Sequence, residues 1–234
     1  TSHSFADDDW STIINNVKNG NTGDYNVGDT KTIELTGYGT HTLRIANKST
    51  PSECNTSSFS QTACGFVLEF ADIITEHAMN DTNTNVGGWP ATSMRTFVNN
   101  DIYNVIPSEI KNAIIDTTVV SGHGSTSGET NFTSTDKLYL LSTAEVWAQG
   151  SSSTIDYDTA RDVTRQLDYY KNLGTSTSNY SGAIKNGTND SAWGLRVAYS
   201  DNTADFCTVV GYGGSGFRGV ATRTFGVSPA FRLG

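Results

Sequence analysis

The spacing of apolar residues predicts a helix near the start of the chain. In DDDWSTIINNVKNG, apolar side chains recur at intervals of three and four, which places them on one helical face. That face carries Trp10, Ile13, Ile14 and Val17. Asp9 is suited to cap the N-terminus, and Gly20 is suited to end the helix. We therefore expect an amphipathic helix between Asp9 and Gly20.

Alternating apolar and polar residues then predict strands. YNVGDTKTIEL alternates at Ile33 and Leu35, and HTLRIANK alternates at Leu43 and Ile45. The turn sequence TGYGT joins the two stretches, a pattern typical of a β-hairpin. GFVLEFADII follows as the next strand, because every second residue from 66 to 70 is apolar.

The middle of the chain favours helices. GGWPATSMRTFVNNDIYNVIPSEIKNAII predicts one helix from about Thr92 to Ile102 and a second that begins near Pro107, since proline is favoured in the first helical turn. KLYLLS is apolar enough for a buried strand. In STAEV, which follows it, Ser142 and Glu145 have the spacing of a capping box.

DTARDVTRQLDYYKNLG has the strongest helical pattern in the chain. Val163, Leu167 and Tyr170 recur at i, i+4 and i+7, and Gly174 is suited to end the helix. From Thr175 onward the composition turns to Ser, Asn, Thr and Gly, which predicts short strands divided by turns. Because no internal repeat and no linker divides the sequence, we expect residues 1–234 to form a single α+β domain, with helices packed on short antiparallel sheets.

Composition excludes several function classes. Apolar residues make up 35% of the chain, enough for a core, and heavy use of Gly, Ser, Thr and Asn is typical of loop-rich extracellular proteins. A net charge of −9 argues against nucleic-acid binding, which depends on neutralising phosphates. No apolar run approaches the length of a membrane span, and TSHSFADDDW is not a signal peptide. The chain is therefore expected to be mature or cut from a longer protein.

The three cysteines leave one question open. Cys54 and Cys64 flank a polar stretch that a local disulfide could close, or they are two free thiols. A bridge would imply an oxidising, extracellular setting. Cys207 stands in an apolar-alternating segment and is expected to be a small buried residue.

The search for catalytic chemistry is negative. The histidines His3, His41, His77 and His123 lie in no metal-binding spacing such as H-E-x-x-H. GHGS at residues 122–125 has no G-x-S-x-G nucleophile to accompany it. The acidic run Asp7–Asp9 lacks the pattern of a Ca²⁺ loop, and the sequence offers neither Glu69 nor Glu145 a carboxylate partner. We expect neither enzymatic activity nor a cofactor or metal.

One phosphate-loop motif is present and needs another explanation. Gly211, Gly213 and Gly216 match G-x-G-x-x-G after an apolar run. The residues that follow have no helical stripe, and too few remain for a dinucleotide-binding unit. The glycines are instead expected to form turns in a hairpin region.

The C-terminal segment, residues 193–232, combines two sets of residues. The frame set, which marks strands and turns, is Trp193, Leu195, Arg196, Phe206, Val209, Gly213, Ala221, Gly226, Val227, Pro229, Ala230 and Phe231. The intervening set is Tyr199, Asn202, Asp205, Thr208, Tyr212, Phe217, Arg218, Thr222, Arg223 and Phe225. This mixture of aromatic, arginine and small polar residues is typical of a binding surface.

This frame, with the upstream stretches VGDTK, GGWPATSMR and LYLLSTAEVW, resembles the C-type-lectin-fold variable proteins of diversity-generating retroelements. It also resembles a related domain of unknown function of gut Firmicutes and their phages. The resemblance covers nearly the whole chain. It departs from the family at Arg196-Val197-Ala198, where members often have R-S-P, so the first turn of the segment differs.

The resemblance implies a C-type-lectin-like fold and a variable region at about residues 197–225, mutagenised at template adenines. Asparagine codons altered in this way do not yield Lys, Glu, Gln, Met or Trp, and none of these occurs in residues 197–225. The intervening set would be the ligand-binding residues. Gly213 would belong to the frame, and variation would reach Gly214, Gly216 and Gly219.

The implied function is recognition of a protein or glycan ligand on a cell surface, by a phage tail or a bacterial surface adhesin. Sugar-binding Ca²⁺ motifs such as E-P-N, Q-P-D and W-N-D are absent. Two alternatives are a relative of the formylglycine-generating oxidases, which share this fold type and need a reactive cysteine arrangement with copper, and a fixed structural module of a virion or surface appendage.

Exposure can be predicted for the residues of this segment. Tyr199, Tyr212, Phe217 and Phe225 stand in Gly- and Thr-rich turns, so we expect them at the surface. Arg218 and Arg223 should also be exposed, because burial of an unpaired arginine is costly. The second group, expected in the core or in structural hydrogen bonds, is Phe206, Phe231, Arg196 and Arg232.

Overall fold

The structure is a computed structural model that describes residues 3–150, 153–186 and 192–234. Its strands are β1 (Thr30–Leu35), β2 (Gly39–Asn47), β3 (Val67–Phe70), β4 (Thr75–Ala78), β5 (Ile114–Ile115), β6 (Thr117–Ser121), β7 (Phe132–Asp136), β8 (Trp193–Ala198), β9 (Asp205–Val209), β10 (Gly216–Val220), β11 (Thr224–Val227) and β12 (Ala230–Leu233). Its α-helices are α1 (Trp10–Lys18), α2 (Ser93–Phe97), α3 (Tyr103–Val105), α4 (Ser108–Lys111), α5 (Thr143–Val146), α6 (Ser153–Asp156) and α7 (Asp168–Asn172). Shorter turns of 3-10 helix are η1 (Ser52–Asn55), η2 (Gln61–Ala63), η3 (Trp89–Ala91), η5 (Arg161–Val163) and η6 (Ser181–Ala183), and η4 (Val98–Ile102) is a π-helical turn.

The strands form two five-stranded sheets and a separate two-stranded ribbon of β6 and β7. The first sheet has the order β1-β2-β3-β12-β5 and is antiparallel throughout. The second sheet has the order β10-β9-β8-β11-β4, and its β8–β11 pair alone is parallel. Short helices combined with mainly antiparallel sheets confirm the expected α+β class.

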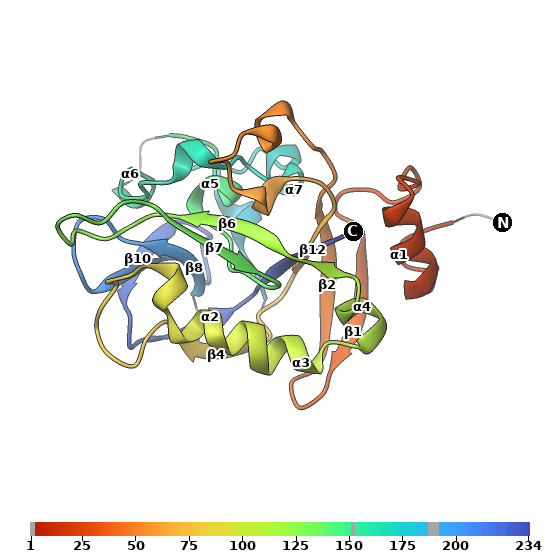
Figure 1. The fold of residues 1–234 in the computed structure, drawn as a ribbon, viewed down its shortest axis with the longest axis horizontal. Helices are drawn as coiled ribbons and strands as arrows, with labels where there is room; N and C mark the ends of the chain where they lie inside the picture. The colour runs from red at the N-terminus through yellow and green to blue at the C-terminus, as the bar shows by residue number, and fades with distance from the viewer. Residues whose placement is uncertain (1–2, 151–152, 187–191) are drawn as a thin grey trace.

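The two sheets lie at opposite ends of the molecule (Figure 1). β1 and β2 stand beside α1 on the right of the view, whereas β8 and β10 lie on the left. The C-terminal strands join the two ends: β11 belongs to the second sheet, and after Ser228 and Pro229 the chain enters the first sheet as β12. The last two strands of the chain therefore connect the two sheets directly.

The N-terminal elements follow the sequence pattern. The side chain of Asp9 accepts a hydrogen bond of 2.8 Å from the Thr12 backbone N–H and caps α1, and Gly20 follows the helix with a φ of 72°. β1 and β2 pair as the expected hairpin, with Ile33 opposite His41. The helix predicted over residues 92–102 also forms, but it continues through the π-helical turn to Val105, and Pro107 directly precedes α4.

Two predictions in the middle of the chain are wrong. Residues 158–174 do not form one helix, because Thr164 and Leu167 adopt extended backbone between η5 and α7. Tertiary hydrogen bonds to the chain around Glu145 outweigh the helical pattern: the Leu167 N–H donates to the Glu145 carbonyl, and the Gln166 amide donates to the Val146 carbonyl. KLYLLS is largely buried but is no regular strand, since its only ladder contact with a described residue is a bridge between Tyr139 and Ala230.

The core runs from one end of the chain to the other. One cluster of buried apolar residues includes Phe5 and Trp10 as well as Phe231 and Leu233. Cys54 and Cys64 form a disulfide, which answers the question that the sequence left open. Cys207 is free and buried, as expected.

Within the described residues, no helix is both long and apolar enough to cross a membrane. This agrees with the absence of a long apolar run in the sequence.

Candidate functional site

A pocket of about 520 Å³ opens on the second sheet, at the strands of the C-terminal segment. Strands β9, β10 and β11 and the turns beside them contribute its lining residues, which are Ala192, Thr208, Val210, Gly211, Tyr212, Phe217, Arg218, Arg223, Thr224 and Phe225. The pocket thus gathers six of the ten residues predicted to bind ligand: Thr208, Tyr212, Phe217, Arg218, Arg223 and Phe225. Its volume lies within the range of small-molecule sites.

The sheet register places the aromatic residues. Phe217 on β10 lies opposite Thr208 on β9, so both side chains point to the same face of the sheet. Phe225 on β11 is 2% exposed, and its ring packs against Gly219 and Gly194, where no side chain intervenes. The prediction that Phe225 is exposed is therefore wrong. Phe225 forms the floor of the pocket.

Two aromatic residues that line the pocket are exposed: Tyr212 and Phe217 are 85% and 56% exposed, which confirms the prediction for these two positions. Tyr212 lies in the turn between β9 and β10. That turn is fixed by the Gly214 N–H, which donates to the Val210 carbonyl at 2.9 Å, and by the Trp147 indole, which donates to the Gly214 carbonyl at 3.1 Å. A fixed turn therefore carries the most exposed aromatic ring of the site.

Arg218 is held in place by its neighbours. Its Nε lies 3.2 Å from the Asp205 carboxylate, and its Nη1 donates to the Tyr199 hydroxyl at 3.3 Å. The guanidinium also lies over the Tyr199 ring, at 4.9 Å from the centroid. The Asn202 amide donates to the same Asp205 oxygen that binds Arg218. Asp205, Tyr199 and Asn202 are therefore supporting residues of Arg218 and do not line the pocket.

The prediction that Tyr199 is exposed is wrong. Its side chain is buried, with its ring 4.8 Å from that of Tyr157. Burial raises the pKa of the Tyr199 phenol, although the nearby Arg218 lowers it in part. The buried Tyr199 ring thus packs against the guanidinium of Arg218.

Arg223 and Thr222 have different partners from Arg218. All three residues are exposed, which confirms the prediction for Arg218 and Arg223. Thr222 donates from its backbone and its hydroxyl to the Asn83 side-chain oxygen and lies outside the pocket. Arg223 lines the pocket and has no ion pair with any residue that the structure describes. One cation of the site is therefore available to a ligand.

Some residues of the site were missed by the sequence analysis. Val210 and Thr224 lie inside the expected variable region and could have been found from its boundaries, whereas nothing in the sequence marks Ala192. Asn85 was missed as well. Its buried amide donates to the Tyr199, Asn202 and Asp205 carbonyls and fixes the loop between β8 and β9.

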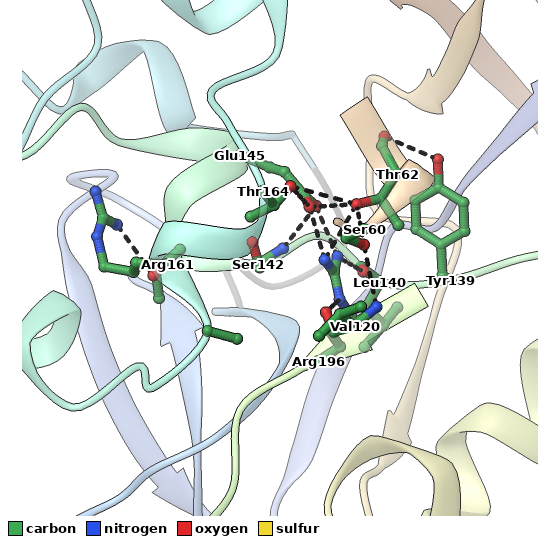
Figure 2. Close-up of polar contacts among 12 residues, drawn as sticks. Ser60, Thr62, Val120, Tyr139, Leu140, Ser142, Glu145, Arg161, Thr164 and Arg196 are labelled. Carbon is green, nitrogen blue, oxygen red and sulfur yellow. Dashed lines mark hydrogen bonds and ion pairs between the residues drawn. The ribbon is translucent and has the colours of Figure 1, made fainter. Parts of the chain in front are cut away.

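A buried ion pair fixes β8 beneath the site (Figure 2). Arg196 on β8 and Glu145 on α5 are fully buried and form two hydrogen bonds of 2.6 Å, which confirms the structural role expected of Arg196. The hydroxyls of Thr62 and Thr164 also donate to the Glu145 carboxylate. Burial would raise the pKa of Glu145, but Arg196 and these hydroxyls outweigh it and hold the pKa below its usual value.

The other frame residues expected in structural roles behave likewise. Phe206 and Phe231 are fully buried. The Arg232 guanidinium donates to the Thr117 hydroxyl and to the Cys64 carbonyl. Glu69, the second acid for which the sequence offers no carboxylate partner, is buried, with a carboxylate oxygen 2.7 Å from the Lys185 Nζ.

The residues considered for catalysis are not brought together. His41 forms a hydrogen bond with Asp72, while His77 stacks on Phe97 and the His123 ring donates a hydrogen bond to the Gly124 carbonyl. In residues 3–150, 153–186 and 192–234, no group of three or more His, Cys, Asp or Glu side chains is placed to hold a metal ion. Burial raises the pKa of the Cys207 thiol well above its usual value.

Fold and site together define an α+β protein with a solvent-facing aromatic and arginine pocket near its C-terminus. A family model described as "Domain of unknown function (DUF6273)" matches residues 65–234. This match spans well over half of the chain, and the chain belongs to that family. No curated protein and no solved structure matches it.

Proposed function

We propose that this protein is a ligand-recognition domain with a C-type-lectin-like fold, whose exposed C-terminal residues are diversified by retroelement mutagenesis. The observation that carries the proposal is the pocket. Six residues chosen from the sequence as ligand-binding line a single pocket that holds the exposed side chains of Tyr212, Phe217 and Arg223. Aromatic and arginine side chains of this kind dominate binding energy in recognition surfaces.

The division between frame and variable positions supports the same proposal. Trp193, Leu195, Phe206 and Val209 are fully buried, as a constant scaffold requires. Substitution of buried residues of this size would create cavities that destabilise the fold. Exposed positions such as Tyr212 can change without that cost, so a variable pocket rim on a constant frame is compatible with folding.

The setting we propose is extracellular, on a phage tail or a bacterial surface, where the ligand is a protein or glycan on a cell. The Cys54–Cys64 disulfide supports this setting, because disulfides persist in oxidising compartments. The net charge of −9 supports a partner other than nucleic acid.

Two alternatives are less well supported. An oxidase of the formylglycine-generating type needs accessible cysteine chemistry, whereas Cys207 is buried and the two other cysteines are bridged. A fixed structural module leaves the pocket without a purpose. The gene sequence distinguishes a fixed module from a diversified one. A nearby repeat that differs from the codons of residues 197–225 only at adenines of the repeat would support diversification.

The test of the proposed function uses fluorescently labelled protein and a panel of intact bacterial cells. We expect the wild-type protein to bind some members of the panel, and the triple variant Tyr212→Ala, Phe217→Ala, Arg223→Ala to lose at least nine-tenths of that binding. Since all three side chains are exposed, its melting temperature should change by no more than a few degrees.

The matched control replaces exposed residues elsewhere on the surface, with Lys18→Ala, Val86→Ala and Leu173→Ala. This control should bind cells as the wild-type protein does. Equal binding by both triple variants would contradict the proposed site. A collapse in the stability of the pocket variant would show that its side chains serve the fold.

A further inference from the structure

The charge of the pocket differs from the charge of the whole molecule. The chain carries 24 acidic and 15 basic residues, yet Arg218 and Arg223 both line the pocket and none of its described lining residues is acidic. The pocket is therefore positively charged on a protein whose net charge is negative. A surface with this arrangement favours an anionic ligand group.

The number of charges limits what that group can be. Arg218 is already paired with Asp205, and Arg223 has no ion pair within the part of the chain that the structure describes. Among the residues that the structure describes, the pocket with its supporting acid therefore carries one uncompensated positive charge. A single carboxylate balances that charge, whereas a phosphate monoester would bring more negative charge than one guanidinium neutralises.

The remaining surface of the pocket favours a sugar ring. Phe225 supplies an apolar floor, and Phe217 and Tyr212 stand exposed beside it. Aromatic faces of this kind pack against the C–H faces of a ring. The hydroxyls of Thr208 and Thr224 lie at the same pocket and can exchange hydrogen bonds with ring hydroxyls. The pocket volume of about 520 Å³ suits one or two sugar rings better than a broad protein interface.

We propose that the pocket binds a carboxylate-bearing sugar of a cell-surface glycan, with Arg223 on the carboxylate and Phe217 and Tyr212 against the ring. This inference rests on the proposed function, because it names the ligand class of the same pocket. Arg218 is not assigned to the carboxylate, since its guanidinium is already held by Asp205 and Tyr199.

The test is a printed glycan array that contains uronic-acid and sialic-acid glycans beside their carboxyl-reduced counterparts, in which the acid has become a primary alcohol. The full protein should bind carboxylated members and lose binding to the reduced ones. Titration calorimetry with the best member should show affinity weakened about tenfold or more by Arg223→Gln, since a charge-assisted hydrogen bond is lost. The control Lys18→Gln, which removes the same charge at an exposed position of α1, should leave affinity unchanged.

Three results would overturn the inference: binding of reduced and carboxylated glycans alike, no binding to any carboxylated member, or tighter binding of a penta-glutamate peptide than of the acidic glycans. Its failure is distinguishable from failure of the proposed function. If the Tyr212, Phe217, Arg223 variant loses binding to whole cells while acidic glycans are ignored, the recognition domain stands and the ligand class is wrong.

Discussion

Two glycines lie beneath the floor of the pocket. A methyl group at position 219 would lie 2.8 Å from the Phe225 ring, closer than side-chain carbons approach one another, and one at position 194 would lie 3.4 Å from the same residue. The Phe225 ring can therefore occupy this position only because residue 219 lacks a side chain, whereas a methyl group at position 194 would just touch Phe225. The sequence shows Phe225 among Thr and Gly residues, which is typical of an exposed turn, and does not show that these glycines lie beneath it.

The replacement Gly219→Ala tests this contact. The added methyl group must displace the buried Phe225 ring, so we expect the free energy of unfolding to fall by about 1–3 kcal/mol. The double variant Gly219→Ala, Phe225→Val should be less destabilised than the sum of the two single variants, because the smaller side chain makes room for the methyl group. Denaturant unfolding of the three variants measures the coupling.

Gly23→Ala is the matched control, since Gly23 is exposed and nothing lies within 4 Å of the added carbon. Additive effects of Gly219→Ala and Phe225→Val would contradict the contact. Coupling would have a consequence for the proposed diversification: a relative with a side chain at position 219 needs a smaller residue at position 225.

The room for a side chain at the other glycines is the opposite of what the family resemblance implies: the glycine expected to be constant has more room than those expected to vary. Gly213, expected in the constant frame, has only the Tyr180 ring near a Cβ, at 3.9 Å. Gly214, expected to vary, has the Tyr180 carbonyl oxygen 2.2 Å from that point, and Gly216 has Thr154 at 2.9 Å. In this chain, packing restricts Gly214 and Gly216 more than Gly213.

At the scale of elements, short-range patterns could be predicted and long-range partners could not. The α1 cap, the β1–β2 hairpin and the hairpin-rich C-terminus follow from neighbouring residues. The predicted helix at residues 158–174 fails because residues far away in the sequence decide its backbone: the hydroxyl of Thr164 donates to Glu145, whose carboxylate also accepts from Arg196, Thr62 and the Ser142 N–H. No local pattern contains that information.

The disulfide stabilises the segment that supplies Thr62 to this buried network. Cys54 and Cys64 close a loop with a sequence separation of 10, and Thr62 lies inside it. Cross-linking restricts the unfolded chain, so the variant Cys54→Ser, Cys64→Ser should lose about 2–3 kcal/mol of unfolding free energy. Thermal or denaturant unfolding measures this loss.

The reductant response provides the control. Wild-type protein in excess reductant should unfold like the double serine variant, and the variant itself should not respond to reductant. Cys207 is free in both proteins, so it does not contribute to the difference. A wild-type protein whose stability is unchanged by complete reduction would contradict the expected role of the bridge.

At the scale of the whole molecule, the residues that line the pocket could be predicted better than the residues that hold them in place. The sequence indicated which residues to consider, and the pocket gathers the exposed Tyr212, Phe217, Arg218 and Arg223 as well as the buried Thr208 and Phe225. The sequence could not show that Tyr199 and Asp205 hold the Arg218 side chain, because these contacts depend on the pairing of β9 with β10.

The acid response of the molecule follows from its buried ion pairs. The pKa values of Glu69 and Glu145 are lowered, because Lys185 and Arg44 in one case and Arg196 in the other outweigh the effect of burial. The unfolded chain therefore takes up protons on these groups at higher pH than the folded chain does. Their contribution to stability is present above the usual glutamate pKa of 4.5 and is lost as pH falls below it. Asp158, whose pKa is raised by burial, acts in the opposite direction.

The variant Glu145→Gln isolates one of these groups. At pH 7 it should unfold with about 3–5 kcal/mol less free energy than the wild-type protein, because Arg196 is left buried without its anion. As pH falls from 5 toward 3, the wild-type protein should lose stability faster, so the difference between the two proteins narrows. Denaturant titrations at several pH values measure both curves. Glu109→Gln, an exposed substitution on α4, should run parallel to the wild-type protein throughout. A difference between Glu145→Gln and wild type that stays constant from pH 7 to pH 3 would show that the Glu145–Arg196 pair does not govern the acid response.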